Sequence, residues 1–488
     1  MAENRTRQAM IQTLGCQMNV YDSERMIAML LEMGYTLTDS PWKADLVIVN
    51  TCAIREKAEQ KVFSSVGRLC GIKRRRPGMR IAVAGCVAQQ QAQKIADRFA
   101  GVNLILGTRV IHRLPAHIRA LENGENRIVD VEMPDDRTAE PLGRDAETAI
   151  VPHGQNIQSG GVSRYVTIMR GCDNFCAYCV VPYVRGREAS RPPERIVSEV
   201  KELVAAGARE VTLLGQNVNS YGKKEGLCSF AGLLERVSKV EGLERIRFVT
   251  SHPKDLSDEL VAAFGAVDKL CNHIHLPLQS GANPVLKRMN RKYTRESYME
   301  RIEKLRSVRP DIAVTTDFIV GFPGERREDF EMTLDLLSKV EFDTLFAFAY
   351  SDRPQAPARR FDGKVDPAEK HARLRELLDC QEQITRRIYE RLVGRTMNVL
   401  VEGVSKHGRN TEGADMQEPV EMSGRSPENR IVNFEVPPGA GMQASEALIG
   451  KIIPVVIDRA CANSLKGKMP ANGSAVRDTN KGGKIHAA

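Results

Sequence analysis

The stretch RYVTIMRGCDNFCAYC, residues 164–179, joins a strand-like apolar run to three closely spaced cysteines. Cys172, Cys176 and Cys179 follow the predicted strand at its carboxyl end, where β/α barrels keep their chemistry. Structural zinc sites and electron-transfer clusters usually take four protein ligands. A set of three leaves one metal position open, which is typical of a catalytic centre. The alternative interpretation is a zinc knuckle that a distant residue completes.

The residues around this stretch predict a domain of alternating strands and helices over 163–390. Strand candidates lie at 164–170, 210–215, 245–250, 273–278, 313–321 and 344–350. Helical patterns such as 194–207 separate them, which indicates a parallel sheet. Because a closed barrel of this type needs about eight strands, we expect an open or partial (β/α)6 barrel.

A second parallel sheet is predicted before it, within residues 7–132. Apolar strand candidates at 9–15, 44–50 and 80–85 each precede a helical pattern, at 23–34, 55–69 and 89–100. Cys16, Cys52 and Cys86 come just after these three strands. Since the carboxyl ends of parallel strands share one edge, we expect the three thiols to converge there.

Three converging thiolates without a nearby histidine suit an iron–sulfur cluster that keeps one iron open. Gly15 and Gly85 would let the backbone turn sharply around such a ligand. The helices that follow point their N-termini at the same place, which favours thiolate over thiol. The alternative is three buried free cysteines, a common fate for this residue.

The remaining segments are less regular. Residues 133–162 are polar and are predicted to form a linker. Short strands at 396–403, 430–436 and 451–460, between Gly-rich turns, predict a small all-β barrel over 391–466. The Gly- and Lys-rich residues 467–488 are expected to form a disordered basic tail.

Composition limits the classes of function. The chain has no apolar run of about eighteen residues and no signal-peptide pattern, so we expect a cytoplasmic protein without membrane attachment. Eleven cysteines in a reducing compartment favour metal binding or catalysis over disulfides. The net charge of +9 suits a nucleic-acid partner or a solvated basic surface equally well. Candidates for RNA contact in the C-terminal barrel are Arg395, Lys406, Arg409, Arg425 and Arg430.

Longer motifs narrow the interpretation to a family. The chain resembles the radical S-adenosylmethionine (SAM) methylthiotransferases, and within them the tRNA branch that makes 2-methylthio-N6-dimethylallyladenosine. The resemblance covers roughly residues 9–467 and implies a methylthiotransferase domain, a radical SAM barrel and an RNA-binding, TRAM-like barrel. The motifs that carry it are NTCAIREKAEQKV (50–62), GCDNFCAYCVVPYVRGRE (171–188), LLGQNVNSYG (213–222), HLPLQSG (275–281) and DFIVGFPGE (317–325).

The resemblance implies two [4Fe–4S] clusters. The cysteines at 172, 176 and 179 would hold one, whose open iron binds the amino and carboxylate groups of SAM. Tyr178 would lie beside the adenine of SAM. The cysteines at 16, 52 and 86 would hold an auxiliary cluster that carries the sulfur. One SAM would methylate that sulfur and the other would yield a 5′-deoxyadenosyl radical, so that a methylthio group reaches C2 of N6-isopentenyladenosine at tRNA position 37.

The sequence also predicts further site residues and partners. Gln216 and Gln279 end predicted strands and are candidates for SAM or base contact, or else cap helices. His252, His273 and His275 have no ligand spacing with the cysteines and are expected to be structural. An external electron donor and a sulfur donor or iron–sulfur carrier are expected partners.

Alternatives for the function stay open. They are methylthiolation of threonylcarbamoyladenosine in tRNA, methylthiolation of a ribosomal-protein aspartate, and a non-catalytic iron–sulfur carrier that binds RNA. The segment YSDRPQAPA (350–358) departs from the family pattern, because Gln355 and Ala356 stand where Gly and Thr are usual. This departure puts the fit of the substrate there in question.

Overall fold

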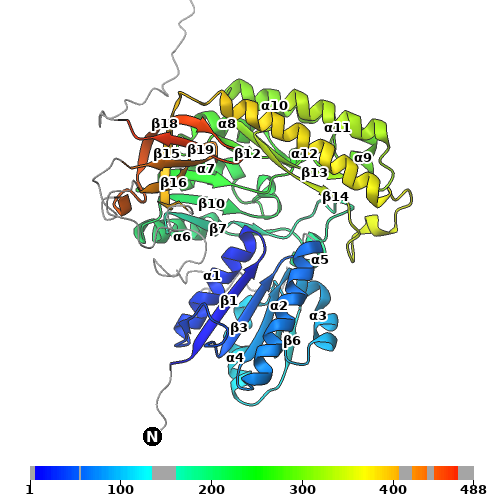
Figure 1. The fold of residues 1–488 in the computed structure, drawn as a ribbon, viewed down its shortest axis with the longest axis vertical. Coiled ribbons are helices and arrows are strands. Elements are labelled where there is room, and N and C mark those ends of the chain that lie inside the picture. The colour runs from blue at the N-terminus through cyan, green and yellow to red at the C-terminus, as the bar shows by residue number, and fades with distance from the viewer. Residues whose placement is uncertain (1–5, 54–55, 134–160, 406–419, 437–444, 471–488) are drawn as a thin grey trace, which may run out of the picture.

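A computed structural model describes residues 6–53, 56–133, 161–405, 420–436 and 445–470. Its elements form three groups: an N-terminal sheet, a six-stranded β/α half-barrel and a small C-terminal barrel (Figure 1). This arrangement confirms the predicted fold class. Most of the predicted linker, the candidates Lys406 and Arg409, and residues 471–488 lie outside the described residues.

The N-terminal sheet has six parallel strands in the order β2-β1-β3-β4-β5-β6. The strands are β1 (Gln8–Leu14), β2 (Thr36–Leu37), β3 (Leu46–Thr51), β4 (Arg80–Gly85), β5 (Leu104–Leu106) and β6 (Ile128–Asp130). The helices are α1 (Gln17–Glu32), α2 (Glu56–Arg75), α3 (Cys86–Arg98) and α4 (Leu114–Glu122), with a 3-10 turn, η1 (Ile111–Arg113). Helix α1 starts six residues before the predicted position, directly after Cys16.

Strand β3 shows why both faces of this sheet are covered. Leu46 and Ile48 pack in the core beside α1 and α4, whereas Val47 and Val49 pack in the core beside α2 and α3. An unbroken apolar run is what a strand buried on both faces requires. The carboxyl end of the strand is therefore the place where polar and thiol side chains can gather.

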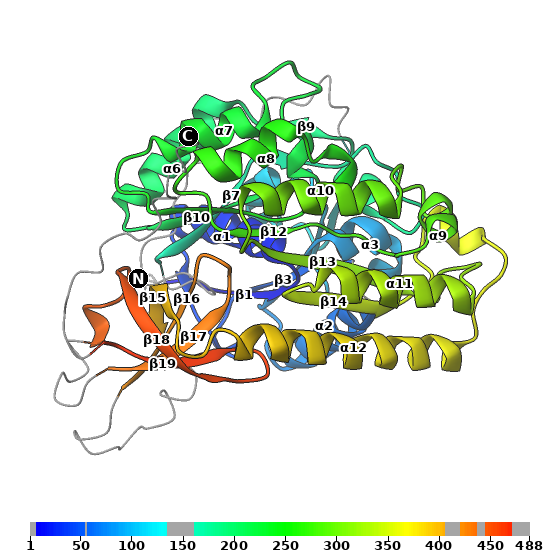
Figure 2. The same cartoon turned by 90° about the horizontal axis from the view of Figure 1, so that it is seen from above.

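The second group is the predicted partial barrel. Two parallel three-stranded sheets, β11-β10-β7 and β12-β13-β14, are joined by one bridge between Ile246 and Leu270. The strands are β7 (Ser163–Thr167), β10 (Glu210–Leu214), β11 (Arg245–Phe248), β12 (His273–His275), β13 (Ala313–Val320) and β14 (Thr344–Ala349). The outer helices are α6 (Pro193–Ala205), α7 (Phe230–Ser238), α8 (Asp258–Ala266), α9 (Asn283–Arg288), α10 (Arg295–Val308), α11 (Arg327–Val340) and α12 (Pro367–Glu390) (Figure 2).

The first predicted strand of this barrel is interrupted. Strand β7 ends at Thr167, and a separate short strand β8 (Met169–Arg170) pairs with β9 (Ala189–Ser190). The helix α5 (Val181–Arg185) lies between them. The cysteine loop therefore lies in the connection between the paired strands β8 and β9, just after the end of β7.

The C-terminal group is a closed barrel in the order β15-β16-β17-β19-β18, as expected for a small all-β domain. Its strands are β15 (Thr396–Val404), β16 (Glu421–Arg425), β17 (Ile431–Glu435), β18 (Ile452–Ala460) and β19 (Leu465–Lys468). Strand β19 runs two residues past the predicted end at 466, because Gly467 packs closely against Val456 of β18 and completes the barrel.

Strand β11 ties this barrel to the half-barrel. Ile246 and Phe248 pack in the helix-covered core, so Arg245 and Arg247 point to the opposite side. The Arg245 guanidinium donates to the carbonyl oxygens of Arg425 (2.7 Å) and Asn398 (2.9 Å). The Arg247 guanidinium donates to the carbonyl oxygen of Ser426 at 2.6 Å. Buried arginines of the half-barrel thus donate hydrogen bonds to backbone carbonyl oxygens of the small barrel.

Arg430 adds an ion pair to this interface. Its guanidinium donates three hydrogen bonds to the carboxylate of Asp343, at 2.7, 2.9 and 3.1 Å. Only 10% of the Arg430 side chain and 5% of the Asp343 side chain are exposed. This corrects one expectation. Arg430 holds the two domains together, so it is no longer a candidate for RNA contact. Arg425 pairs with Glu402 at 3.2 Å and is partly exposed, and Arg395 is exposed.

Replacing Arg430 by Ala is expected to destabilise the chain by about 3–5 kcal/mol, because Asp343 is left charged and buried without its partner. Thermal and urea unfolding of the variant measure the loss. The matched control is Arg430→Met with Asp343→Leu, which removes both charges and should recover most of the stability. An unchanged unfolding midpoint in Arg430→Ala would contradict the structural role.

Candidate functional site

The carboxyl edges of the N-terminal sheet and the half-barrel meet. Helix α1 packs against β7, and Met18 and Tyr21 of α1 form an apolar cluster with Leu214 of β10. Helix α3, which begins with Cys86, packs against α5, which begins two residues after Cys179. The two predicted cysteine sites therefore lie on facing edges of neighbouring domains (Figure 1).

The structure brings the first three cysteines to one edge, as the strand pattern predicted. Cys16 caps α1 after β1, Cys52 follows β3, and Cys86 opens α3 after β4. Cys52 and Cys86 are each 5% exposed. A hydrogen bond with Cys52 lowers the pKa of the Cys16 thiol to about 6, against the effect of burial. The pKa of Cys86 is raised by burial.

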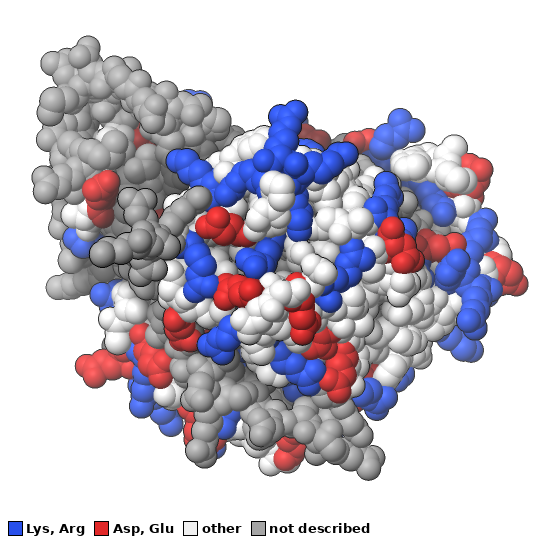
Figure 3. Space-filling model, turned by 90° about the horizontal axis from the view of Figure 1, so that it is seen from below, with Lys and Arg blue, Asp and Glu red and all other residues white. Residues whose placement is uncertain are grey.

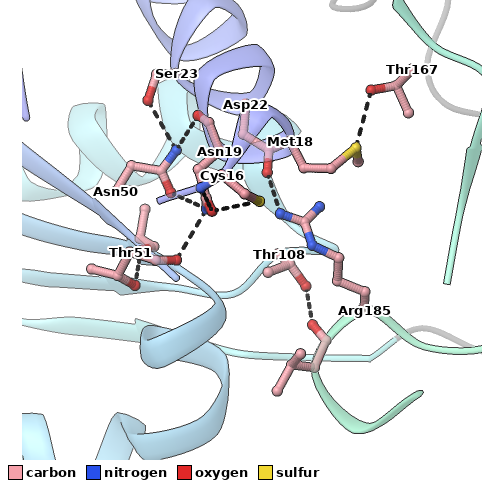
Figure 4. Close-up of polar contacts among 12 residues, drawn as sticks. Cys16, Met18, Asn19, Asp22, Ser23, Asn50, Thr51, Thr108, Thr167 and Arg185 are labelled. Atoms are coloured by element: carbon pink, nitrogen blue, oxygen red, sulfur yellow. Dashed lines mark hydrogen bonds and ion pairs between the residues drawn. The ribbon is translucent and has the colours of Figure 1, made fainter. Parts of the chain in front are cut away.

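A buried amide network orders this edge (Figure 4). The Asn19 side chain donates to Asn50 Oδ1 (3.2 Å) and to the carbonyl oxygen of Thr51 (3.0 Å). Its Oδ1 accepts from the backbone N–H of Cys16 at 3.2 Å. The Thr51 hydroxyl in turn accepts from the N–H of Val87 in α3. The network thus links the three strand ends that carry the cysteines. Asn50 and Thr51 open the motif at 50–62, whereas no quoted motif contains Asn19.

The two glycines of this edge are required for different reasons. Gly85 has a φ of +93°, and a Cβ there would lie 2.4 Å from the Thr51 carbonyl oxygen. At Gly15 a Cβ would lie 2.2 Å from Asn19 Oδ1, although its φ is not positive. Close approach of Asn19, rather than a sharp turn around a ligand, therefore explains the glycine at position 15.

Arg185 reaches into this site from the other domain. It ends α5 of the half-barrel, is 7% exposed, and its guanidinium pairs with the Asp22 carboxylate at 2.9 Å. Its positive charge acts on both Cys16 and Cys86 in the direction that lowers their pKa values. Arg185 stands in the motif at 171–188, but its pairing with Asp22 could not be predicted because the two residues are 163 positions apart.

The second triad lies in the loop after β8. Cys176 is buried, and its sulfur accepts from Arg291 Nη1 at 3.3 Å. Asn174 Nδ2 donates to the sulfur of Cys172 at 3.6 Å. Burial raises the pKa of Cys172 to about 11 and that of Cys179 to about 12. Bound iron would instead lower the pKa of these thiols, because a thiol that coordinates a metal is deprotonated.

The polar candidates of the barrel surround this loop. The Oε1 of Gln216 accepts from the N–H of Gly171, while its Nε2 is buried and has no hydrogen-bond partner among the described residues. Gln279 is buried with a strained φ of +75° and pairs through its backbone with β13. The Tyr178 hydroxyl accepts from Arg291 Nη1 at 3.2 Å. An unsatisfied buried donor and a strained backbone are features of ligand sites.

Two residues of this site escaped sequence reasoning. Arg291 is 4% exposed and binds Tyr178, Cys176 and the carbonyl oxygen of Pro277. His252, expected to be purely structural, places Nε2 4.0 Å from the Cys176 sulfur. Burial keeps its pKa far below the usual range, so the imidazole is neutral. Both residues lie too far along the chain from Cys176 for spacing to reveal them.

The spacing of the side chains tests the kind of metal group. Among the residues described, no three His, Cys, Asp or Glu side chains are close enough to hold a single metal ion. A zinc knuckle requires ligands that close on one ion. In a four-iron cluster each thiolate binds a different iron, so the sulfurs stand farther apart and both triads remain suitable.

Known proteins resemble this chain in sequence over nearly its whole length. Residues 8–107 match the uncharacterized protein family UPF0004, and residues 166–337 match the radical SAM superfamily. The tRNA-2-methylthio-N(6)-dimethylallyladenosine synthase of Desulfosudis oleivorans is 52% identical over 98% of this chain and 99% of its own. The chain belongs to the tRNA-2-methylthio-N(6)-dimethylallyladenosine synthase family. The synthase of Geobacter sulfurreducens is 48% identical over 94% of this chain and 96% of its own.

Membership of this family makes the chain a tRNA methylthiotransferase of the radical SAM type, which uses SAM and [4Fe–4S] clusters. The fold agrees with the radical SAM methyltransferase TsrM from Kitasatospora setae, solved with cobalamin and a [4Fe-4S] cluster. That structure has a TM-score of 0.52 at 13% identity and covers 84% of this chain and 82% of its own. In the described part of the chain, no helix is long and apolar enough to cross a membrane.

The departure from the family pattern lies where the two domains touch. Gln355 has a φ of +71°, a left-handed conformation that glycine adopts freely and that costs another residue about 1 kcal/mol. Ala356 is buried in the same core as Val180 and Val184. The neighbouring Pro354 carbonyl accepts from Gln90 Nε2 of α3 at 3.2 Å. At position 355 this chain therefore carries a side chain on a backbone conformation that glycine adopts more readily.

Proposed function

We propose that this enzyme methylthiolates C2 of N6-isopentenyladenosine at position 37 of tRNA. Cys172, Cys176 and Cys179 would hold the [4Fe–4S] cluster that binds SAM, and the N-terminal triad would hold the auxiliary cluster. The observation that carries the proposal is the meeting of the two cysteine edges, with α3 against α5. The names of the relatives supply the product.

The residues around Cys176 prepare a site for SAM. When bound, the cluster and SAM supply an electron and a 5′-deoxyadenosyl radical that can remove hydrogen from an aromatic carbon. Arg291 holds Tyr178 and Cys176 together, and neutral His252 adds no charge beside the sulfur. The free Nε2 donor of Gln216 is available to a bound molecule. These residues orient the cofactor and exclude water from it.

The N-terminal site would keep the sulfur that is transferred. Three thiolates leave one iron for an added sulfur, and one SAM per turnover would methylate it while another yields the radical. Arg185 offsets part of the negative charge of these thiolates. An external electron donor and a sulfur donor or iron–sulfur carrier would act from solution in the cytoplasm.

The C-terminal barrel would bind RNA in the manner of a TRAM domain. Arg395 and Arg425 remain candidates for contact on its surface, and Lys406 and Arg409 are proposed with them. Polyanion binding agrees with the net charge of the chain. The boundaries 7–132, 133–162, 163–390 and 391–466 remain the proposed division into domains, with the barrel extended through Lys468.

Anaerobic assay of the reconstituted, reduced enzyme tests this function. With SAM and isopentenylated tRNA, the isopentenyladenosine is expected to gain the mass of a methylthio group, and 5′-deoxyadenosine is released. Threonylcarbamoylated tRNA and ribosomal proteins serve as separate substrates. A mass gain only in one of those would refute the proposed substrate, and absence of 5′-deoxyadenosine throughout would indicate a carrier.

Replacing Arg185 by Met is expected to empty the N-terminal site of iron, leaving about four irons per chain instead of about eight. The variant removes a cation from beside two thiolates and leaves Asp22 charged and buried. Iron and sulfide analysis of anaerobically purified protein measures the loss. In the control Arg185→Met with Asp22→Asn, the buried charge is gone, so persistent iron loss would assign the effect to the thiolates.

A further inference from the structure

The cysteine loop of the half-barrel presents an aromatic ring to solvent. Phe175 is exposed, although the next residue, Cys176, is buried. The φ of Phe175 is +48°, a left-handed conformation that costs a residue other than glycine about 1 kcal/mol. Asn290 secures this backbone, because its Nδ2 donates to the carbonyl oxygen of Phe175 at 2.9 Å. The loop thus turns a thiol inward and the neighbouring ring outward.

Cationic side chains surround this ring. The guanidinium carbon of Arg187 lies 5.0 Å from the centre of the Phe175 ring. Lys254 donates to Oδ1 of Asn174, the residue before Phe175, at 2.8 Å. Lys292 is exposed just after the turn that secures the loop. Together with Lys223, which shares an aspartate with Lys254, the ring and its cations form what we call the loop face: Phe175, Arg187, Lys223, Lys254 and Lys292.

The carboxylates that pair with these cations lie beneath them. Arg187 pairs with Asp173 at 2.9 Å, and 58% of the arginine side chain is exposed against 28% of the aspartate. Lys223 and Lys254 both pair with Asp255, whose side chain is only 11% exposed. The exposed fractions of the two lysine side chains are 56% and 35%. Each ion pair therefore turns its positive end to solvent, so the face is cationic although these charges are paired.

Short contacts join the loop face to the barrel triad. Lys254 holds Asn174, whose Nδ2 donates to the sulfur of Cys172 at 3.6 Å. One amide thus separates a surface ammonium from a sulfur ligand. Phe175 precedes Cys176 directly in the chain. The loop face therefore offers a short path from solvent to the proposed SAM-binding cluster.

The partner of this face follows from its position and charge. Cleavage of SAM in the proposed reaction consumes one electron, which an external donor would supply to the barrel cluster. All five residues of the loop face belong to the half-barrel, whereas the tRNA adenosine would have to reach the space between the two domains. An aromatic residue among charged side chains is typical of a protein interface, and a cationic face attracts an acidic partner. A donor protein therefore fits this face better than RNA does.

We propose that the loop face is the docking surface of an acidic, flavodoxin-like electron donor. The exposed ring favours a flavin protein, because an aromatic side chain packs well against a flat aromatic group. In a flavodoxin that group lies outside the carboxyl ends of the strands. The inference rests on the proposed function and names the partner of its barrel cluster. On contact the flavin loses one electron and the cluster gains it, and no bond forms or breaks between the two proteins.

Binding of a purified bacterial flavodoxin, in its oxidised form, to the full-length, reconstituted enzyme tests this surface without turnover. Lys292→Glu is expected to weaken binding about tenfold and to reduce its dependence on salt, because it reverses a charge at the rim of the contact. Phe175→Ala should also weaken binding about tenfold but leave the salt dependence unchanged, since it removes apolar area and no charge. Titration calorimetry at several salt concentrations measures both effects. Iron content and unfolding temperature identify a variant that fails to fold, and the other variant then decides.

The matched control is Arg75→Glu, at the exposed C-terminal end of α2 and away from the cysteine edges. Lys and Arg side chains also gather on the side of the N-terminal sheet (Figure 3), so general attraction of an acidic protein has to be measured. Arg75→Glu should bind flavodoxin as the wild type does. An equal loss of affinity in Arg75→Glu and Lys292→Glu would overturn the proposal.

The rate of cluster reduction gives a second measurement. Reduced flavodoxin should reduce Lys292→Glu about tenfold more slowly than the wild type, as followed by the loss of cluster absorbance in stopped flow. Reduced methyl viologen, a small cation, needs no cationic surface, so its rate should not fall. A parallel fall with both reductants would place the defect in the cluster site and overturn the docking role.

The remaining outcomes separate the rivals. Weaker binding of isopentenylated tRNA in Lys292→Glu, with flavodoxin binding unchanged, would assign the loop face to RNA and refute the proposal. Binding of a bacterial ferredoxin at this face in place of flavodoxin would refute the flavin donor. Failure of the proposed function is distinguishable, since flavodoxin would then still bind and reduce the enzyme while no methylthiolated nucleoside formed.

Discussion

Cys176→Ser is expected to abolish release of 5′-deoxyadenosine, with a loss of about a thousandfold or more. Cys176 is the buried member of the barrel triad and lies in contact with Arg291 and near His252. Soft thiolate binds iron of a cluster, whereas a serine hydroxyl stays protonated and binds it poorly. The chain should retain about four irons instead of about eight.

The measurement combines iron analysis with chromatography of the products from SAM under reducing, anaerobic conditions. Cys380→Ser in α12 is the matched control, because this thiol lies on a helix far from the cysteine loop. The control should retain both iron and product. Full 5′-deoxyadenosine release in Cys176→Ser would show that the barrel triad does not hold the SAM-binding cluster.

Cys16→Ser is expected to separate the two halves of the reaction. Methylthiolated tRNA should fall below detection, about a thousandfold loss, while 5′-deoxyadenosine release remains measurable. The reason is local: Cys16 caps α1 at the N-terminal edge and belongs to the other triad. About four irons should again be lost, now from the N-terminal site.

Nucleoside mass spectrometry and 5′-deoxyadenosine release are measured on the same reaction. Cys70→Ser in α2 is the control, since this cysteine lies in the N-terminal sheet group but away from the strand ends. Methylthiolated product at the wild-type level in Cys16→Ser would remove the N-terminal triad from the sulfur-carrying role. Loss of both products would mean that the two sites depend on each other.

The placement of the six cysteines could be predicted because a parallel sheet fixes where its carboxyl ends lie. Cys16, Cys52 and Cys86 each follow a strand, and strand order brings those strands side by side as β1-β3-β4. The same reasoning anticipated six strands in the half-barrel. It did not anticipate β16 and β19, whose polar and Gly-containing sequences carry little alternation.

The partners of the cysteines could not be predicted in this way. Arg185 reaches Asp22, and Arg291 reaches Cys176, across long separations that only the docking of domains creates. Arg430 shows the same limit of sequence reasoning. Its position on a strand of the small barrel predicted an exposed basic residue, but the structure buries it in an ion pair between two domains. Local pattern predicts an edge, but tertiary contact decides which charges meet there.

Helix α5 has a consequence for how the two halves of the enzyme can vary. The same short segment begins beside Cys179 and ends at Arg185, so it serves one cysteine site at its start and the other at its end. A single inserted residue would rotate Arg185 by about 100° around the helix axis. The length of α5 thus sets how the two cysteine sites are placed relative to each other. A change of one residue in this segment would misalign them without altering any of the six cysteines.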